Sequence, residues 1–260
     1  MKDILKKLKS EVQLIGRNEV LFAKWGRISN WGDSINPILV KIISGKKVVY
    51  RSNSPYIKFI DRILNRTTYI VVGSILNWAD SNTIVWGPGF ISNDSRLSKK
   101  PKKICAVRGP LSRKIVIRQG IECPKIYGDP ALLYPRFYKS KEIKRKYKIG
   151  LIPHYMDKKH KWLKFIKEKH GDDILIIDIE GEINRVVDDI TSCKVIASSS
   201  LHGIIVSDAY RIPSTWIKLS DSVIGNGFKF RDYFQSVNRK LEDPLIVKND
   251  INPPPKGERL

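Results

Sequence analysis

The chain alternates short apolar runs with segments of helical periodicity along most of its length, and this alternation constrains the fold more than any other feature. Strands that alternate with helices form mainly parallel sheets with helices packed against them, so the sequence predicts an α/β protein. The expected strands are residues 69–76, 83–86, 103–107, 148–152, 174–179 and 194–197, and the expected helices are residues 110–119, 160–169, 183–191 and 201–210.

A charged stretch at residues 138–148 (YKSKEIKRKYK) separates two series of these segments. The length of the chain allows two domains of roughly 130 residues each. We therefore expect an N-terminal lobe over residues 1–138, a C-terminal lobe over residues 148–240 and a Pro-rich surface tail over residues 241–260. Ligands of open α/β sheets bind beyond the carboxyl ends of the strands, so we expect two Rossmann-like lobes with a central cleft.

The chain is strongly basic, with 48 Lys and Arg against 26 Asp and Glu and a formal net charge of +22. Such a charge raises the question of nucleic acid binding. The basic clusters at residues 99–103 and 139–148 carry neither a stacking platform of aromatics nor a base-reading motif, and we predict no nucleic acid partner. These clusters form solvated loops or attract a polyanionic substrate or an acidic bilayer.

The cysteines Cys105, Cys123 and Cys193 lie far apart and form no C-x-x-C motif, which argues against a disulfide framework and a Cys-rich zinc site. The first residues lack the apolar core of a signal peptide, and no run approaches the length of a membrane span. We expect a cytoplasmic protein whose charge allows association with the inner face of an anionic membrane, and we expect no metal site and no cofactor.

The segment SNWGDSINP places Asn30, Gly32 and Asp33 directly before a helical run that begins at Ile35. Glycine allows close backbone approach, and a helix N-terminus offers N–H groups to an anion. The segment predicts either a substrate-binding turn or an ordinary Asx turn that caps the helix.

Glycines also follow two expected strands, as Gly73-Ser74 after YIVV and as Gly87 after TIVW. Neither segment is a dinucleotide-binding or P-loop motif, so no nucleotide site follows from them. Two such glycines at the same sheet edge favour the floor of a ligand site over two unrelated turns.

Arg108 leaves an expected strand, and Gly109-Pro110 begins the next helix. A guanidinium beside a helix N-terminus is a planar fork suited to a phosphate or carboxylate, and the alternative is a surface arginine paired with an acid. Asp129, in YGDPAL, is expected to be a buried turn carboxylate that either caps the next turn or binds substrate.

The segment VIASSSLHGIIVSD (residues 195–208) runs from a strand through Ser199, Ser200 and Leu201 to His202, in the first turn of an apolar helix. The positive end of the helix dipole favours a neutral imidazole, which can act as a general acid or base. The alternative is a core histidine bonded to a backbone carbonyl. His154 ends the first strand of the second lobe and is a second polar candidate.

The segments NWGD, VVGSIL, VWGPGF, VRGPLSR, YGDPALL, IGLIPHY, SSSLHGIIVSDAYRIPS and FKFRDYF, in this order, resemble the polysaccharide pyruvyl transferase family over residues 28–235. The resemblance implies transfer of the carboxyethylidene unit of phosphoenolpyruvate to two sugar hydroxyls, which forms a pyruvate ketal on a cell-surface or capsular polysaccharide or on its lipid-linked repeat unit. It also implies a fold similar to that of GT-B glycosyltransferases, with the donor in the cleft.

By this resemblance Arg108 holds the donor's anionic groups, His202 is the catalytic histidine and Lys229 is a functional lysine. Many members have Arg-Leu-His where this chain has Ser200-Leu201-His202. A second cation for the donor would then come from Arg231, Lys218 or Lys229.

Two other functions remain open from the residues. A glycosyltransferase that uses a nucleotide sugar needs an acid for the ribose, and Glu180 or Glu182 could supply it. A non-catalytic basic protein that binds glycans or other polyanions would bind them with steep salt dependence and release no phosphate.

Overall fold

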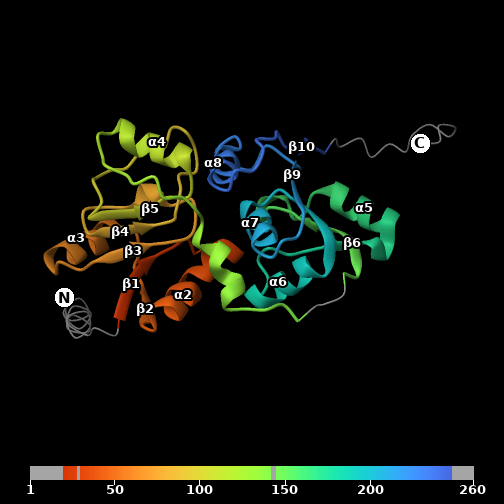
Figure 1. Ribbon diagram of the computed structural model, residues 1–260, viewed down its shortest axis with the longest axis horizontal. Coiled ribbons are helices and arrows are strands. Elements are labelled where there is room, and N and C mark those ends of the chain that lie inside the picture. The colour runs from red at the N-terminus through yellow and green to blue at the C-terminus, as the bar shows by residue number, and fades with distance from the viewer. Residues whose placement is uncertain (1–19, 28–29, 142–144, 248–260) are drawn as a thin grey trace. The chain divides into compact units, whose positions relative to one another are not determined.

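The computed structural model describes residues 20–27, 30–141 and 145–247. The chain forms two compact units (Figure 1). Among the described residues, unit 1 consists of residues 20–27, 32–131 and 227–240, and unit 2 consists of residues 30–31, 132–141, 145–226 and 241–247.

Unit 1 is built on a five-stranded parallel sheet with the strand order β2-β1-β3-β4-β5. The order reverses between β1 and β3, because the chain first adds β2 on one side of β1 and then returns to the other side. The strands are β1 (Val20–Lys24), β2 (Lys47–Tyr50), β3 (Thr68–Ile70), β4 (Thr83–Trp86) and β5 (Lys103–Ala106), and the helices are α2 (Trp31–Ser44, whose first residue is grouped with unit 2), α3 (Pro55–Ile63), α4 (Pro110–Arg118) and α8 (Phe228–Ser236).

Unit 2 is built on a second five-stranded parallel sheet with the order β10-β9-β8-β6-β7. Numbered along the chain, the strands of both sheets follow the doubly wound order 2-1-3-4-5. The strands are β6 (Tyr147–Ile152), β7 (Ile174–Ile176), β8 (Cys193–Ser198), β9 (Ser214–Lys218) and β10 (Leu245–Ile246), and the helices are α5 (Lys161–His170), α6 (Ile183–Thr191) and α7 (Leu201–Ala209).

Each unit has its own apolar core. In unit 1, Ile70 and Val85 from the sheet pack with Ile115 of α4 and Phe228 of α8. In unit 2, the core residues are Leu151, Leu163, Ile174, Ile217 and Leu219. Burial of these side chains holds the helices on the sheets, and the loops at the carboxyl ends of the strands then carry polar groups.

The predicted α/β fold with parallel strands is confirmed, and each expected strand and helix has a counterpart. Two of the expected strands are much shorter than predicted, because 69–76 is a strand only at Thr68–Ile70 and 174–179 only at Ile174–Ile176. The elements β1, β2, α3, β9 and α8 were not predicted from the sequence. The sequence analysis also placed residues up to 240 in the C-terminal lobe, whereas α8 belongs to unit 1 because Phe228 packs into that core. In the expected tail, β10 pairs with β9, and residues 248–260 lie outside the described residues.

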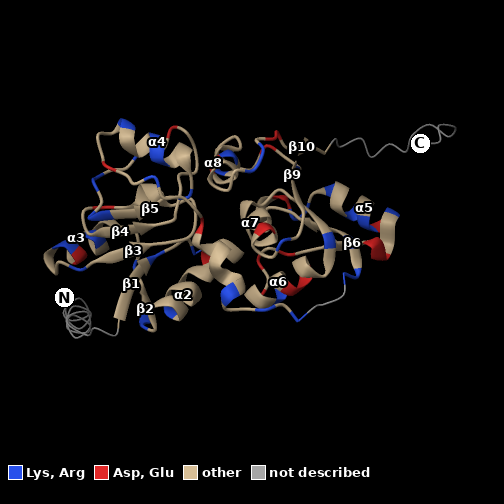
Figure 2. Cartoon of the chain, in the orientation of Figure 1, with Lys and Arg blue, Asp and Glu red and all other residues tan. Residues whose placement is uncertain are grey.

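The three cysteines form no disulfide, and burial raises the pKa of the Cys123 and Cys193 thiols to about 11. Within the described ranges, no helix is long and apolar enough to cross a membrane. Lys and Arg occur on elements of both units (Figure 2).

Candidate functional site

In unit 1, the point where the strand order reverses lies between β1 and β3, and ligands of open α/β sheets bind beyond the strand ends at such points. Asp33, in the first turn of α2, lies here. A Cβ atom at Gly26 would come within 2.5 Å of the Asp33 carboxylate, and one at Gly73 would lie 3.8 Å from Asp33 Oδ1. The structure therefore brings the predicted residues Asp33 and Gly73 together, while Gly32 lies one position before Asp33 in α2.

Asn36 holds this region together and was missed by the sequence analysis. Its Oδ1 accepts a hydrogen bond from Val72 N at 2.9 Å, and its Nδ2 donates to Val72 O at 3.2 Å. These bonds fix the segment after β3 against α2. A buried Asn on the inner face of an apolar helix was the signal for this role, since a buried amide needs partners.

The loops after β3, β4 and β5 contact one another. Gly89 N donates to Gly73 O at 3.1 Å, and Gly87 N donates to Ala106 O at 2.9 Å. Gly87 has a φ of +98°, and a Cβ there would lie 2.2 Å from Pro130 Cδ, so the site needs glycine. The glycines that the sequence analysis singled out thus lie at one edge of the sheet.

Arg108 lies in this edge but is fully buried, with 0% of its surface exposed. Its Nε donates to Asp232 Oδ2 at 3.1 Å, its Nη1 to Ser74 Oγ at 2.8 Å and its Nη2 to Phe90 O at 2.6 Å. Arg108 is therefore paired with an acid, as one of the two predictions had it. The pair does not lie at the surface, because Arg108 and Asp232 are both fully buried.

Asp232, on α8, joins Arg108 to α4. Its carboxylate also accepts hydrogen bonds from Ser112 N at 2.9 Å and from Ser112 Oγ at 2.6 Å. A Cβ at Gly109 would lie 1.9 Å from Asp232 O, so this glycine permits the close approach of α8 to the start of α4. The sequence analysis quoted Asp232 within FKFRDYF but gave it no role.

Lys229 and Asp129 are two further titratable groups on which the charge of Arg108 acts. Burial, together with the Arg108 charge, lowers the pKa of Lys229 to about 8. Burial raises the pKa of Asp129 to about 6, against the opposing effects of the Ala131 N–H and Arg108. Asp129 Oδ1 accepts from Ala131 N at 3.0 Å, so its expected capping role is confirmed.

Lys229 differs from Arg108 in its partners. Among the described residues, no carboxylate forms an ion pair with its ammonium, whose Nζ lies 5.7 Å from the centroid of the Phe230 ring. Arg108 is thus ion-paired with Asp232, whereas Lys229 is a cation of unit 1 that forms no ion pair within the described residues. Such a half-buried cation can attract a carboxylate or phosphate.

In unit 2, the strand order reverses between β6 and β8, and His154 and Ser199 follow these two strands. His154 N donates to Ser199 Oγ at 2.8 Å, and Ser199 Oγ donates to Asp157 Oδ2 at 3.1 Å. Asp157 also accepts a hydrogen bond from Ser220 Oγ. Asp157 and Ser220 were not predicted from the sequence. No local motif marks a carboxylate that accepts hydrogen bonds from serines of two other loops.

The serines before α7 form hydrogen bonds with one another and with the end of β6. Ser200 N donates to Ser198 Oγ at 3.0 Å, and Ser198 Oγ lies 3.0 Å from its acceptor Ile152 O. A Cβ at Gly203 would lie 2.3 Å from Ser198 Oγ, so the start of α7 packs tightly on β8. Ser200 is the N-cap residue and makes no side-chain cap bond, and Leu201 is buried.

His202 is the second residue of α7, as predicted, and lies beside an aromatic wall. Its imidazole centroid is 6.3 Å from that of Trp31, which in turn contacts the Tyr134 ring edge to face at 5.6 Å. Trp31 is fully buried, and its Nε1 donates to Ile183 O at 3.1 Å. Asn30 lies next to Trp31 in the chain. Trp31 was visible in the motif NWGD, but its role as a wall depends on the tertiary structure.

The acids that a nucleotide sugar would need are already engaged. Glu182 caps α6, where its carboxylate accepts hydrogen bonds from Asn184 N at 3.0 Å and Arg185 N at 2.8 Å. Glu180 pairs with Lys158. Lys218, one of the cations considered for the donor, pairs with Asp221.

A family profile described as polysaccharide pyruvyl transferase matches residues 2–221. The chain belongs to this family. The matched region contains Arg108 and His202 but ends before α8, so the structure and not the match connects Lys229 and Asp232 to unit 1.

Two relatives are similar over long segments. An uncharacterized protein of Acanthamoeba polyphaga mimivirus, L143, is 29% identical over 244 residues, which cover 91% of this chain and 82% of that protein. The succinoglycan biosynthesis protein ExoV of Rhizobium meliloti is 29% identical over 177 residues, which cover 66% of this chain and 54% of ExoV. The chain thus matches about half the length of ExoV.

Proposed function

We propose that this protein transfers the pyruvate unit of phosphoenolpyruvate to two hydroxyls of a sugar, in a cell-surface or capsular polysaccharide or its lipid-linked repeat unit, and so forms a pyruvate ketal. Family membership supports a pyruvyl transferase, and the similarity to ExoV supports an acceptor from exopolysaccharide synthesis. The proposal includes a GT-B-like architecture and a cytoplasmic location at the inner face of a membrane.

The observation that carries the proposal is that Lys229 lies near the buried Arg108–Asp232 pair and, among the described residues, forms no ion pair of its own. Phosphoenolpyruvate carries a carboxylate and a phosphate, and its binding requires a cation that is not already neutralised. In our proposal Lys229 contacts the donor. Arg108 Nη1 donates to Ser74 Oγ and so holds this hydroxyl, which we propose donates a hydrogen bond to phosphoenolpyruvate.

The reaction involves three proton movements, one onto the methylene carbon and one off each sugar hydroxyl. A proton adds to the methylene carbon of phosphoenolpyruvate, and the first sugar hydroxyl attacks the resulting cationic carbon and loses its proton. The C–O bond to phosphate then breaks, and the second hydroxyl attacks and loses its proton as the ketal closes. Of the two protons lost by the sugar hydroxyls, one makes up for the proton added to the methylene carbon, and the other leaves with phosphate.

We assign the proton transfers to His202. It is the second residue of α7, and an imidazole can accept a proton from a sugar hydroxyl and pass it on. The aromatic wall of Trp31 and Tyr134 limits the positions of the ring. Further substrate contacts are proposed for Asn30, Gly32, Gly73, Gly87, Gly109, His154, Ser199, Ser200 and Leu201.

Asp33 and Asp129 are proposed to orient the acceptor hydroxyls. Asp129 Oδ1 accepts a hydrogen bond from Ala131 N, and a carboxylate has sites for further hydrogen bonds. Asp33 lies where the strand order of unit 1 reverses, over Gly26. The binding of sugar hydroxyls by carboxylates is the chemistry that this pair offers.

The test is incubation of the protein with phosphoenolpyruvate and lipid-linked or polymeric glycans, followed by mass spectrometry for the added carboxyethylidene group. Phosphate release is measured in parallel. We expect Lys229→Met to raise KM for phosphoenolpyruvate at least tenfold, whereas Lys161→Met, at an exposed position of α5, leaves it unchanged.

Lys229 also predicts a pH dependence. Its ammonium loses its proton as the pH rises through about 8, so kcat/KM for phosphoenolpyruvate should fall above that pH. Lys229→Arg should move the fall to higher pH, because guanidinium stays charged. Thermal stabilisation by nucleotide sugars but not by phosphoenolpyruvate would contradict the proposal and favour a glycosyltransferase.

A further inference from the structure

Helix α3 carries a stripe of exposed apolar side chains. Tyr56, Phe59 and Ile63 are 50%, 56% and 65% exposed, and their spacing of three and four residues places them on one face of the helix. Large apolar side chains this exposed and this aligned indicate a contact surface rather than scattered surface residues.

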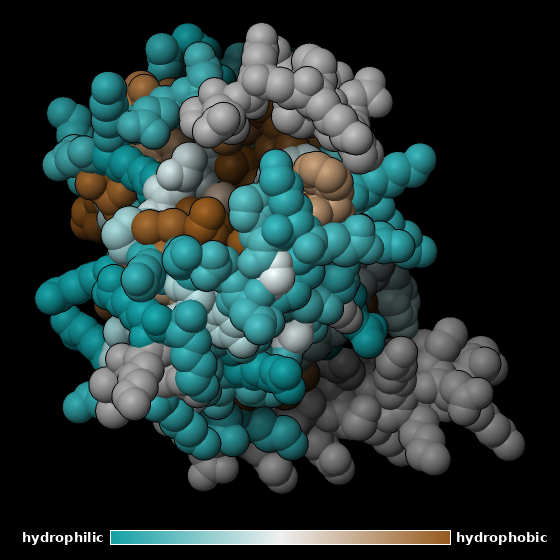
Figure 3. All heavy atoms as spheres, turned by 90° about the vertical axis from the view of Figure 1, so that its right-hand side faces the viewer, coloured by the Kyte–Doolittle hydropathy of each residue, from teal (hydrophilic) through white to brown (hydrophobic). Residues whose placement is uncertain are grey.

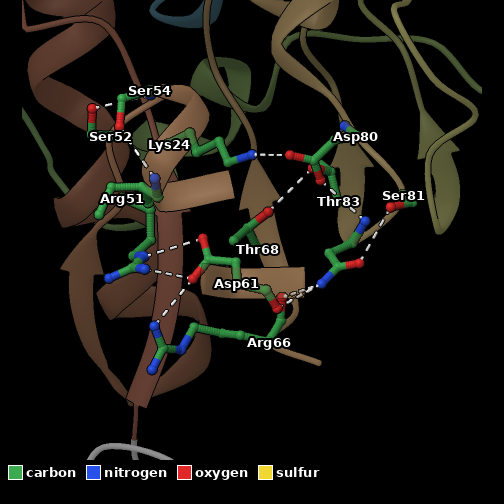
Figure 4. Close-up of polar contacts among 12 residues, drawn as sticks. Lys24, Arg51, Ser52, Ser54, Asp61, Arg66, Thr68, Asp80, Ser81 and Thr83 are labelled. Atoms are coloured by element: carbon green, nitrogen blue, oxygen red, sulfur yellow. Dashed lines mark hydrogen bonds and ion pairs between the residues drawn. The ribbon is translucent and has the colours of Figure 1, made fainter. Parts of the chain in front are cut away.

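The same helix turns its only carboxylate inward (Figure 4). Asp61 is 2% exposed and pairs with Arg51 and with Arg66 Nη1, the latter at 3.1 Å. The outer face of α3 therefore presents apolar and cationic groups and no carboxylate, with Arg62 exposed next to Ile63.

A run of lysines lies beside this helix. Lys102 Nζ donates to Thr67 Oγ1, in the loop that joins α3 to β3, at 2.8 Å. On α3 itself, the pKa of Lys58 is lowered, first by burial and then by the positive charge of Lys24, with a smaller contribution from Lys99. Lys99, a member of the run, therefore lies near enough to α3 for its charge to act on Lys58. The lysines of residues 99–103 are exposed. We call the exposed residues of α3 together with these lysines the α3 surface.

Helix α5 shows that basic charge alone does not produce such a surface. It carries Lys161, Lys164, Lys167 and Lys169, yet none of its large apolar side chains is exposed. Lys167 Nζ is used within the unit, where it donates to Gly171 O and Ile174 O. Figure 3, which views the molecule from the right-hand side of Figure 1, shows a mainly hydrophilic face with smaller apolar areas.

We propose that the α3 surface binds an anionic lipid bilayer, with Tyr56, Phe59 and Ile63 entering the interface and the lysines of residues 99–103 contacting lipid phosphates. Charge complementarity favours this partner. The chain carries a net charge of +22, and the one carboxylate of α3, Asp61, is buried. Apolar residues flanked by cations on a surface helix are the arrangement that interfacial binding requires. This inference rests on and specifies the proposed location at a membrane, and because its test uses no substrate it can fail while the proposed reaction stands.

The experiment is sedimentation of the full chain with vesicles of phosphatidylcholine alone or mixed with phosphatidylglycerol. We expect binding to the anionic vesicles only. The double variant Phe59→Ser/Ile63→Ser should weaken binding at least tenfold, and each lysine of residues 99–103 changed to Ser should weaken it by about fivefold. Circular dichroism and the unfolding midpoint establish that these variants remain folded.

Two matched controls separate the α3 surface from general properties of the chain. Ile42→Ser/Ile43→Ser removes two side chains of α2 that are each 45% exposed, and Lys164→Ser/Lys169→Ser removes two cations of α5. Both should bind like the wild type. Equal loss of binding in the α5 variant, unchanged binding of the α3 variant, equal binding to neutral vesicles, or dimerisation abolished by Phe59→Ser would each overturn the proposal.

Discussion

The two sheets follow the same strand order, yet the points where that order reverses differ in chemistry. Unit 1 assembles charged groups there and at the neighbouring strand ends: Asp33, Asp129 and Lys229, near a buried Arg108–Asp232 pair. Unit 2 places His154 and Ser199 at the corresponding strands and orders them with hydrogen bonds that converge on Asp157.

The same topology therefore fixes where a site can form in each unit, but it does not fix the chemistry of that site. In unit 1 the polar groups depend on α8, which the chain supplies more than a hundred residues after β5. In unit 2 they depend on loops that directly follow their strands. We therefore expect substitutions in unit 1 to affect stability and pH dependence, and substitutions in unit 2 to affect proton transfer first.

The largest effect is expected for His202→Ala. Loss of a general acid or base lowers the rate by about 10²- to 10⁴-fold, so phosphate release should fall by this factor while binding of phosphoenolpyruvate, measured by calorimetry, stays close to wild type. His170→Ala, at an exposed position of α5, is the control. Full turnover in the His202 variant would remove this residue from the mechanism.

Arg108→Met tests the buried pair of unit 1. It leaves the Asp232 carboxylate buried without its cation, and breaking such a pair costs about 3–5 kcal/mol. Urea unfolding should show this loss. The double variant Arg108→Met/Asp232→Leu should recover part of it, because no buried charge remains. An Arg108 variant as stable as the wild type would show that the pair does not tie α8 to unit 1.

Asp129→Asn tests the pKa of a buried acid. The folded protein holds the proton to a pH of about 6, above the ordinary value of 3.8, so the wild type should lose stability as the pH rises from 4 to 6. The loss contributed by this group is about 2–3 kcal/mol. The variant should lack this component, which is measured as the difference between the two unfolding curves. Asp172→Asn, at an exposed position, should not change the pH dependence.

Ser199→Ala is expected to have the smallest effect. It removes the acceptor of His154 N and a donor to Asp157, and loss of a buried hydrogen-bond partner costs about 1–3 kcal/mol. Ser222→Ala, at an exposed position, should cost less. A loss as large as that of Arg108→Met would contradict the contrast between the two units.

Much of the candidate site could be predicted locally. Asp33, Gly73, Gly87, Arg108 and His202 all stand at strand ends or helix starts, where short motifs can be read. Asn36, Asp157, Ser220 and Asp232 could not be found this way, because their partners lie in other loops and a single polar residue carries no motif. Trp31 was present in a motif, but its contact with the His202 ring depends on packing.

The sequence by itself determined the α/β class, the parallel strands and the family, because apolar periodicity and ordered motifs are local properties of the chain. Only the tertiary structure shows that α8 belongs to unit 1, that Arg108 is buried against Asp232 and that Lys229 forms no ion pair within the described residues. Burial and charge balance depend on which segments pack together, and long-range packing leaves no pattern in the sequence of either partner.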